Sequence, residues 1–463
     1  MRLLVPPHHR CDLSRSRRTG TILVITAVIL IALVGLLGLV IDAGQLMTAH
    51  RSTQNAVDAA AAAAAMDLLA GKSESAAVAT ATAFVQQYNG FPISAVTVNI
   101  PPASGPCSGD SHYAEVIVTN SVAVHFIQAL GGATSHMVTA RAVAGWEGTR
   151  VQAGIIALDK NARPGINLTG NGSLKVNGSV LVNSEGGGVA ADGQPIANGN
   201  TGNAVTTSGN GSLYATDVQS VGGVNNPASV KNFNTSNSQS PLHTGAVAQS
   251  DPYAYLPPPT TANGAVPTNY GAVNLSGNQT VTLSPGIYTS IKTSANVNVQ
   301  LNPGVYVITG GGLTMTGNSV LRGEGVMLYN TGSDYSVSTG LPDASDGASA
   351  PPAAGSATFG AVSISGNALL DLTPYSNTSS PFDGMVLYQR RLNTQPLRLS
   401  GNGASDILAG TVYAKWAPLD LSGNGTFNSQ FVVQRLDISG NGTLTLDLTG
   451  QHLARSDQVF LVE

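Results

Sequence analysis

The sequence predicts a mainly β protein with a long N-terminal helix, a small α+β unit and a right-handed parallel β-helix in its C-terminal two thirds. Three observations predict this fold class. Residues 21–41 form an uncharged apolar run, an alanine-rich segment follows, and Ser/Thr-Gly-Asn triplets punctuate short apolar stretches from about Val151 onward. Only 10% of the 463 residues are charged and 54 are glycine, which is typical of repetitive β structure with many tight turns.

The apolar run predicts a membrane anchor, because it matches the roughly 20 residues that cross a bilayer. Arg15, Arg17 and Arg18 precede the run and Asp42 follows it. The positive-inside rule then places the N-terminus in the cytoplasm and everything after residue 42 outside it. The alternative is a cleavable secretory signal, whose apolar core normally spans about 7–15 residues. The longer run favours an uncleaved anchor, although processing stays open.

The two cysteines lie on opposite sides of this span. Cys11 precedes it and Cys107 follows it, so we expect them in different compartments and unable to pair within one chain. Their neighbours show neither a metal-binding nor a redox spacing.

A long helix is expected to continue out of the membrane. Residues 43–70 contain no proline and no glycine after Gly44, and Ala59 to Ala65 form an unbroken alanine run, the best helix former. Gly71 supplies a stop. A continuous helix from Thr21 would be about 75 Å long at 1.5 Å per residue.

Four features in this order resemble the N-terminal segment of the TadG-like Flp pilus-assembly family. They are Arg17-Arg18-Thr19-Gly20, the apolar span, Val40-Ile41-Asp42-Ala43-Gly44, and Gln54-Asn55-Ala56-Val57-Asp58-Ala59-Ala60 with its alanine run. The resemblance covers residues 15–70 strongly and 71–148 loosely. It implies a membrane-anchored protein of a tight-adherence pilus system that acts in assembly or surface attachment, and it carries over no catalytic residue. Gly20 is also similar to a prepilin-peptidase site, but Ile25 stands where pilins have glutamate.

Residues 72–148 predict a small α+β unit whose general plan is similar, by analogy, to pilin heads. Its expected elements are a helix Glu74 to Tyr88, strands Ala95 to Ile100, Tyr113 to Thr119 and Met137 to Gly145, and a short helix Val122 to Leu130.

The remaining chain is repetitive. The glycines of the nine triplets are Gly170, Gly202, Gly209, Gly277, Gly317, Gly366, Gly401, Gly423 and Gly440, and Pro285-Gly286-Ile287-Tyr288 returns as Pro303-Gly304-Val305-Tyr306. A period near 20 residues indicates a solenoid. Alternation such as Val297 to Leu301 indicates β coils. Glycine and asparagine tolerate the left-handed backbone of the corners, and stacked asparagines can hydrogen-bond between coils. A β-sandwich with the same turns is the alternative.

Two stretches interrupt the repeat, near residues 225–270 and 332–356. Long loops of this kind are usually either disordered or functional. If these loops are functional, Tyr253, Tyr255 and Tyr335 are the exposed aromatic residues expected to contact glycans or partners.

Catalytic chemistry is not expected. The densest charged set is Asp371, Asp383, Arg390, Arg391, Asp406, Lys415 and Asp420, but spacing alone does not bring an acid and a base to one cleft. Asp334-Tyr335-Ser336-Val337-Ser338 matches the metal-binding pattern of von Willebrand A domains, yet four residues separate it from the preceding apolar strand and Gly- and Pro-rich sequence follows. We therefore predict no catalytic, cofactor-binding or metal-binding residues. The lack of a basic stripe argues against nucleic acid.

The predicted function is that of a single-pass inner-membrane protein, structural or assembly-related, in an Flp or tight-adherence system, with the bulk of the chain in the periplasm or at the cell surface. Expected partners are the inner membrane, other pilus-assembly proteins and, as a further candidate, surface glycans. The alternative is a membrane-tethered carbohydrate-binding or carbohydrate-cleaving β-helix. The expected domains are residues 1–20 (cytoplasmic tail), 21–41 (transmembrane helix), 42–148 (helix and α+β unit) and 151–463 (solenoid with its two insertions).

Overall fold

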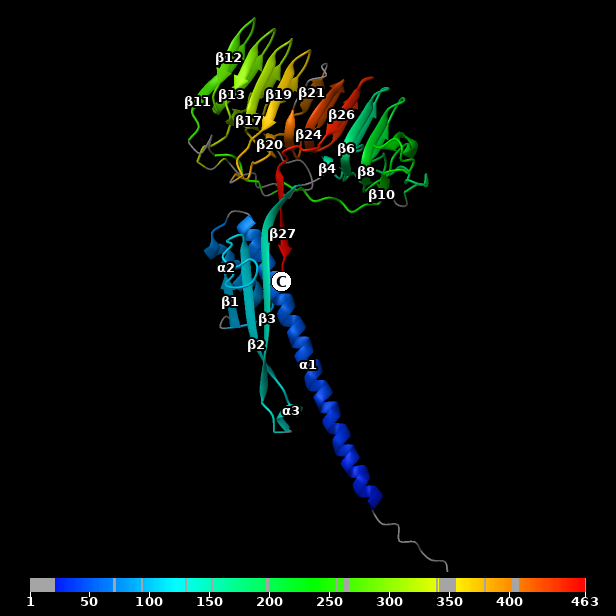
Figure 1. The fold of residues 1–463 in the computed structure, drawn as a ribbon, viewed down its shortest axis with the longest axis vertical. Helices are drawn as coiled ribbons and strands as arrows, with labels where there is room; N and C mark the ends of the chain where they lie inside the picture. The colour runs from blue at the N-terminus through cyan, green and yellow to red at the C-terminus, as the bar shows by residue number, and fades with distance from the viewer. Residues whose placement is uncertain are drawn as a thin grey trace, which may run out of the picture. The chain divides into compact units, whose positions relative to one another are not determined.

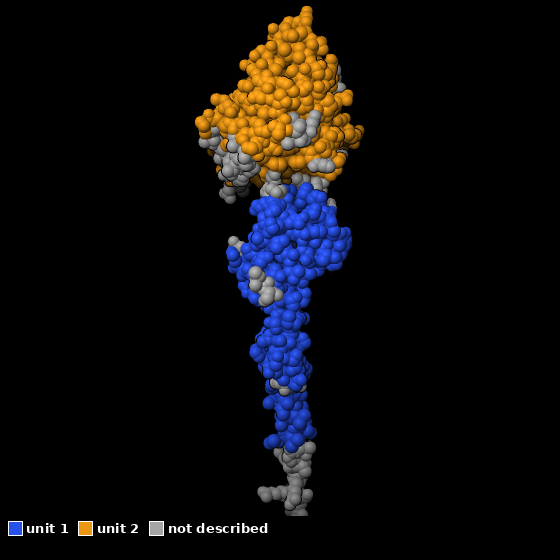
Figure 2. Space-filling model, turned by 90° about the vertical axis from the view of Figure 1, so that its left-hand side faces the viewer, with its two compact units in different colours: residues 1–146, 459–463 blue, residues 147–458 orange. Residues whose placement is uncertain are grey.

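The computed structural model describes residues 21–463 apart from 70–71, 93–94, 130, 151–152, 197–199, 255, 261–265, 339, 341–354, 379, 402–407 and 463. The basic tail, Tyr255, Asp406 and most of the second insertion therefore lie outside the described residues. The chain folds into two units, which Figure 2 colours separately. Unit 1 comprises residues 1–146 and 459–463, and unit 2 comprises residues 147–458.

Helix α1, Thr21–Leu69, is 49 residues long. It confirms the prediction of one continuous helix that starts at Thr21. Its first part is apolar enough to cross a membrane, and its large side chains from Ile22 to Ile41 are exposed. Beyond this part the helix packs against the rest of unit 1 through small side chains, which include Ala56, Ala60 and Ala64, all fully buried. The boundary between exposed apolar and packed helix therefore falls close to the predicted end of the span.

The remainder of unit 1 is a helix–sheet arrangement (Figure 1). Its elements are α2 Glu74–Ala83, the π-helical turn η1 Phe84–Tyr88, β1 Val96–Asn99, β2 Tyr113–Ala123, α3 Phe126–Ala129, β3 Ser135–Arg150 and β27 Arg455–Leu461. The sheet order is β1-β2-β3-β27, with β1, β2 and β3 antiparallel. Each predicted helix and strand of residues 72–148 is present, but α3 is shorter than expected because β2 continues to Ala123.

The end of the chain differs from the prediction that residues 151–463 form a single solenoid. Strand β27 is the fourth strand of the unit 1 sheet, and the Val462 N–H donates a hydrogen bond to the Val143 carbonyl at 2.8 Å. Val459 also packs against the apolar cluster between α1 and the sheet. These contacts explain why residues 459–463 belong to unit 1, so unit 2 is an insertion between β3 and β27.

The described residues of unit 2 form 23 hydrogen-bonded strands. They are β4 Ala153–Ala157, β5 Ile166–Thr169, β6 Ser173–Val182, β7 Val205–Thr207, β8 Ser212–Ser220, β9 Val230–Asn232, β10 Leu242–Thr244, β11 Asn269–Leu275, β12 Thr280–Leu283, β13 Gly286–Thr293, β14 Asn298–Leu301, β15 Gly304–Thr309, β16 Leu313–Met315, β17 Val320–Thr331, β18 Val362–Ile364, β19 Leu369–Pro374, β20 Met385–Gln389, β21 Leu397–Gly401, β22 Ala409–Ala414, β23 Leu419–Gly423, β24 Gly425–Val433, β25 Leu436–Ser439 and β26 Thr443–Asp447. A short 3-10 helix, η3 Pro227–Ser229, precedes β9.

These strands pair in parallel, one sequence repeat above the next. Thr280 lies opposite Asn298, Asn298 opposite Val320, and Val320 opposite Leu369. Parallel pairing of non-adjacent strands is the arrangement expected of a solenoid-like stack of coils. The first insertion is partly regular, since η3, β9 and β10 lie within it.

An asparagine ladder runs along the stack, as predicted. The Asn296 side chain donates to Asn278, Asn318 donates to Asn296, and Asn367 donates to Asn318, at 2.8, 2.9 and 3.1 Å. These pairs are 18, 22 and 49 residues apart in sequence. Each side-chain amide can both donate and accept, so one residue type at one corner can link successive coils.

The chain enters this stack in its middle (Figure 1). Strands β4, β5 and β6 pair on one side with β24, β25 and β26, and β5 and β6 pair on the other side with β7 and β8. The next strand after β10 is β11, from which the chain winds back, coil by coil, until β26 meets β6. The first and last coils are therefore neighbours.

Unit 2 has two apolar cores. Leu, Ile and Val side chains fill the inside of the coils, while a second cluster with Tyr329, Tyr388 and Tyr413 lies on another face of the same strands. Every residue of β20 and β22 is buried as a result. Strands buried on both faces are the usual state of covered parallel sheets.

Candidate functional site

The second core is covered by a segment that we call the strap, residues 249–254 and 256–259. It belongs to the connection that returns from β10 to β11. Tyr253 and Leu256 from the strap are buried in the second core. The Gln249 backbone exchanges hydrogen bonds with the Asn183 side chain at 2.7 and 2.8 Å.

A buried ion pair holds the strap to β22 and the residues after it. Lys415 Nζ lies 3.3 Å from Asp251 Oδ2, and both side chains are only 8% exposed. The Tyr413 hydroxyl donates to the same carboxylate oxygen at 2.8 Å. Burial and the Asp251 charge raise the pKa of Tyr413 well above its ordinary value, so this hydroxyl stays a donor.

Arg391 also binds the strap. Its guanidinium donates to the strap carbonyls of Tyr253 and Leu256 and, at 2.9 Å, to the Tyr413 hydroxyl. The same group lies over the rings of Tyr388 and Tyr413, at 5.7 and 5.4 Å from their centroids. A planar guanidinium suits a position that combines ring stacking with several acceptors.

The expectation of exposed aromatic residues was wrong for Tyr253 and Tyr335. Tyr253 is 1% exposed, and its hydroxyl donates to Gln430 at 2.8 Å. Tyr335 is half-buried, packs on Tyr329 and donates to the Pro259 carbonyl at 2.8 Å. Both rings are used to hold loops onto the second core, so neither is a free surface aromatic.

The other charged residues of the predicted set are spread over separate pairs. Asp383, itself buried, contacts His452 at 2.8 Å, and Arg390 contacts Asp334 at 2.6 Å. Pairs nearer the surface join Asp371 to Arg322 and Asp420 to Arg398, at 3.1 and 3.3 Å. Arg390 therefore neutralises the aspartate of the Asp-x-Ser-x-Ser motif. The described members of the set do not gather in one charged groove.

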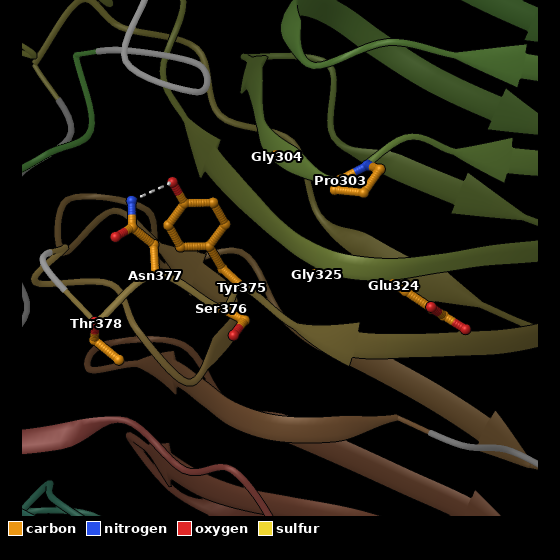
Figure 3. Close-up of a pocket in the computed structure, with 8 residues that line it drawn as sticks. All are labelled: Pro303, Gly304, Glu324, Gly325, Tyr375, Ser376, Asn377 and Thr378. Atoms are coloured by element: carbon orange, nitrogen blue, oxygen red, sulfur yellow. Dashed lines mark hydrogen bonds between the residues drawn. The ribbon is translucent and has the colours of Figure 1, made fainter.

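An open groove of about 790 Å³ lies at one corner of the stack (Figure 3). Its walls come from the β14–β15 turn, the middle of β17 and the residues after β19, and they include Glu324, Tyr375, Asn377 and Thr378. The Asn377 amide donates weakly to the Tyr375 hydroxyl at 3.4 Å, whereas Glu324 points away from both. Glu324 is the one carboxylate among the described lining residues. Sequence analysis missed this groove, because its walls come from three coils.

Unit 1 contains a second polar site, at the end of the apolar part of α1. The carboxylate of Asp42 accepts hydrogen bonds from the backbone N–H groups of His125, Phe126 and Ile127, at 3.2, 2.9 and 2.7 Å. These groups begin α3, where a helix leaves its first N–H groups without partners. Asp42 is fully buried by this contact.

The model of the Flp pilus-assembly TadE/G-like family matches residues 20–67. The N-terminal helix is thus similar to the segment that this family model describes. The match ends close to the end of α1 and so leaves unit 2 outside it. No curated protein and no solved structure matches the chain.

Polar residues of the matched segment make specific contacts with the β2–β3 hairpin. Gln54 donates to Asp58 at 2.8 Å and to the Arg141 carbonyl of β3 at 3.1 Å. Together with Asp42, Gln54 thus fixes α1 to the β2–β3 hairpin at two levels. Asp42 and Gln54 therefore join the helix to the hairpin by hydrogen bonds, whereas Asn55 is exposed.

Proposed function

We propose that this chain is a single-pass inner-membrane protein of an Flp or tight-adherence pilus system. Its N-terminus lies in the cytoplasm, and the residues that follow the membrane span, including all of unit 2, lie outside the cytoplasm. In this position the protein acts in pilus assembly or surface attachment. The observation that carries the proposal is the TadE/G-like match over residues 20–67, which coincides with a helix whose first part is exposed and apolar.

Unit 2 would be the part presented beyond the membrane, as a right-handed parallel β-helix. Parallel registers between successive repeats and the asparagine ladder support this fold. The alternative β-sandwich receives less support, because every pairing between named strands of this sheet in the described residues is parallel, whereas sandwiches pair their strands antiparallel.

The contacts of the charged side chains in unit 2 favour a structural rather than a catalytic role. Lys415 and Arg391 bind the strap, Lys415 through the strap residue Asp251, and Asp383 is buried against His452. Glycoside cleavage generally needs two carboxyl groups about 5–10 Å apart that face the substrate. The groove of Figure 3 offers Glu324 alone among its described residues, so carbohydrate cleavage is the weaker alternative.

Deletion of the gene in its host tests the proposal. We expect the deletion strain to lose Flp pili, counted by electron microscopy, and surface attachment, and the full chain to restore both. A chain in which residues 1–41 are replaced by a cleavable secretory signal should not restore them, because it lacks the anchor. Unchanged pili and attachment in the deletion strain would contradict the proposal.

A further inference from the structure

The tip of the β2–β3 hairpin, residues 122–129 and 131–137, docks onto the apolar part of α1. Phe126 packs so closely on Gly38 that any side chain there would collide with its ring. Asp42, one helical turn further along α1, holds the backbone of residues 125–127. Two independent contacts therefore fix the tip at this height on the helix.

This height lies inside the membrane span. Gly38 precedes the end of the span, Ile41, by three residues, which corresponds to about 4.5 Å along a helix. If α1 crosses a bilayer with residues 21–41, a ring in contact with Gly38 lies below the level at which the helix leaves the apolar region. The tip then lies at the depth where amphipathic elements settle, about 5–10 Å into the boundary between headgroups and acyl chains.

The chemistry of the tip suits that depth. Residues 116–140 contain no Asp, Glu, Lys or Arg. Met137 is 64% exposed and Phe126 is 37% exposed, so apolar side chains face outward where no described part of unit 1 covers them. The first N–H groups of α3, which would be costly to bring into a lipid surface unpaired, already have Asp42 as their acceptor.

We propose that the β2–β3 hairpin tip is a second membrane contact, which enters the lipid headgroup region beside α1. The occupant facing the exposed Phe126 and Met137 side chains is the lipid itself, because Phe126 contacts α1 at Gly38, within the exposed apolar part of the helix. The contact rests on the proposed membrane anchor but not on its orientation, since the tip meets whichever leaflet contains Ile41. Together with the span it would restrict the tilt and rotation of unit 1.

Depth-dependent quenching in the full chain tests the contact. Single cysteines are placed at Met137, at Ser108 in the β1–β2 loop and at Leu36 in the span, in a Cys11→Ser, Cys107→Ser background. Each is labelled with NBD, and the protein is reconstituted in phosphatidylcholine–phosphatidylglycerol vesicles with or without lipids that carry a shallow doxyl quencher. Met137 and Ser108 are exposed, so neither substitution should disturb the fold.

We expect loss of NBD fluorescence at Met137 and Leu36, with Ser108 unchanged. Quenching at Leu36 without quenching at Met137 would overturn the hairpin contact while leaving the anchor intact. A blue-shifted but unquenched probe at Met137 would also overturn it, because it would indicate a protein partner in place of lipid. Absence of quenching at Leu36 would instead overturn the anchor, and the hairpin contact with it.

Discussion

At the residue scale, one corner of the unit 2 coils depends on a left-handed backbone. Gly277, Gly317 and Gly366 adopt φ values of 84°, 75° and 76°, and Ala295 occupies the equivalent position in the intervening coil with φ 61°. Each of them precedes an asparagine of the ladder. The alanine keeps the corner conformation although its Cβ makes that conformation unfavourable.

Replacement of Ala295 by glycine should therefore stabilise unit 2. We expect Ala295→Gly to raise the free energy of unfolding by roughly 1 kcal/mol, measured by urea denaturation, because the left-handed penalty disappears. The reverse change, Gly317→Ala, should be destabilising, since its Cβ would lie 2.8 Å from the Ala295 nitrogen. If both variants instead changed the free energy of unfolding by the same amount in the same direction, the left-handed backbone at Ala295 would carry no strain.

Glu115 links the stability of unit 1 to pH. Burial acts to raise the pKa of Glu115, but hydrogen bonds from Asn99, Arg141 and the Ala103 backbone outweigh burial and lower it below its ordinary value of 4.5. The stabilising contribution of Glu115 is thus complete above about pH 4.5 and is lost as the pH falls through the lower folded-state pKa.

Glu115→Gln should remove this part of the acid sensitivity. At neutral pH we expect the variant to lose about 1–3 kcal/mol of unfolding free energy, because Arg141 keeps a weaker acceptor. Thermal unfolding of wild type and variant between pH 3 and 7 measures the effect, and the two stabilities should converge at the acid end. A constant difference across this range would contradict the assignment.

At the element scale, α1 shows which features of the fold can be predicted from sequence. The alanines at positions 60, 61, 64 and 65 make a surface without long side chains, so the sheet packs directly on the helix. Composition and spacing predict such local features, as they predict the asparagine ladder. The strap could not be predicted, because its irregular sequence is held by contacts with residues remote in the chain, such as Gln430, Arg391 and Lys415.

The buried ion pair of the strap should matter more than exposed pairs. We expect Lys415→Met to lower the unfolding free energy of unit 2 by about 3 kcal/mol, because Asp251 keeps a buried charge without its cation. The matched control is Arg398→Met, which breaks the exposed pair with Asp420 and should cost less than about 1 kcal/mol. Denaturant midpoints of both variants measure the difference, and equal losses would show that the strap does not depend on this pair.

At the scale of the whole molecule, the chain order differs from what periodicity alone suggests. A repeat in the sequence predicts coils, but it does not predict that the first coils stack on the last ones or that β27 returns to unit 1. Both arrangements come from contacts between residues hundreds of positions apart, such as Phe431 opposite Ile155. The groove beside Tyr375 was unpredictable for the same reason.

Removal of residues 459–463 should weaken unit 1 selectively. Deletion takes away Val459, which packs on the apolar cluster, and leaves the Val143 carbonyl without its backbone donor. We expect unit 1 to lose at least about 1 kcal/mol while the thermal midpoint of unit 2 stays unchanged. Calorimetry with limited proteolysis separates the units, and loss of unit 2 alone would contradict the assignment of these residues.

Labelling of the two native cysteines tests the central claim, that a single-pass anchor separates a cytoplasmic tail from an external bulk. Single-cysteine variants, Cys11→Ser and Cys107→Ser, are treated in intact spheroplasts with a membrane-impermeant maleimide. Cys107 is partly exposed, and Ser108→Cys provides a more exposed neighbour as a second reporter. We expect Cys107 to be labelled at once and Cys11 only after lysis, whereas labelling of Cys11 alone, or of neither cysteine before lysis, would contradict a single-pass anchor with this orientation.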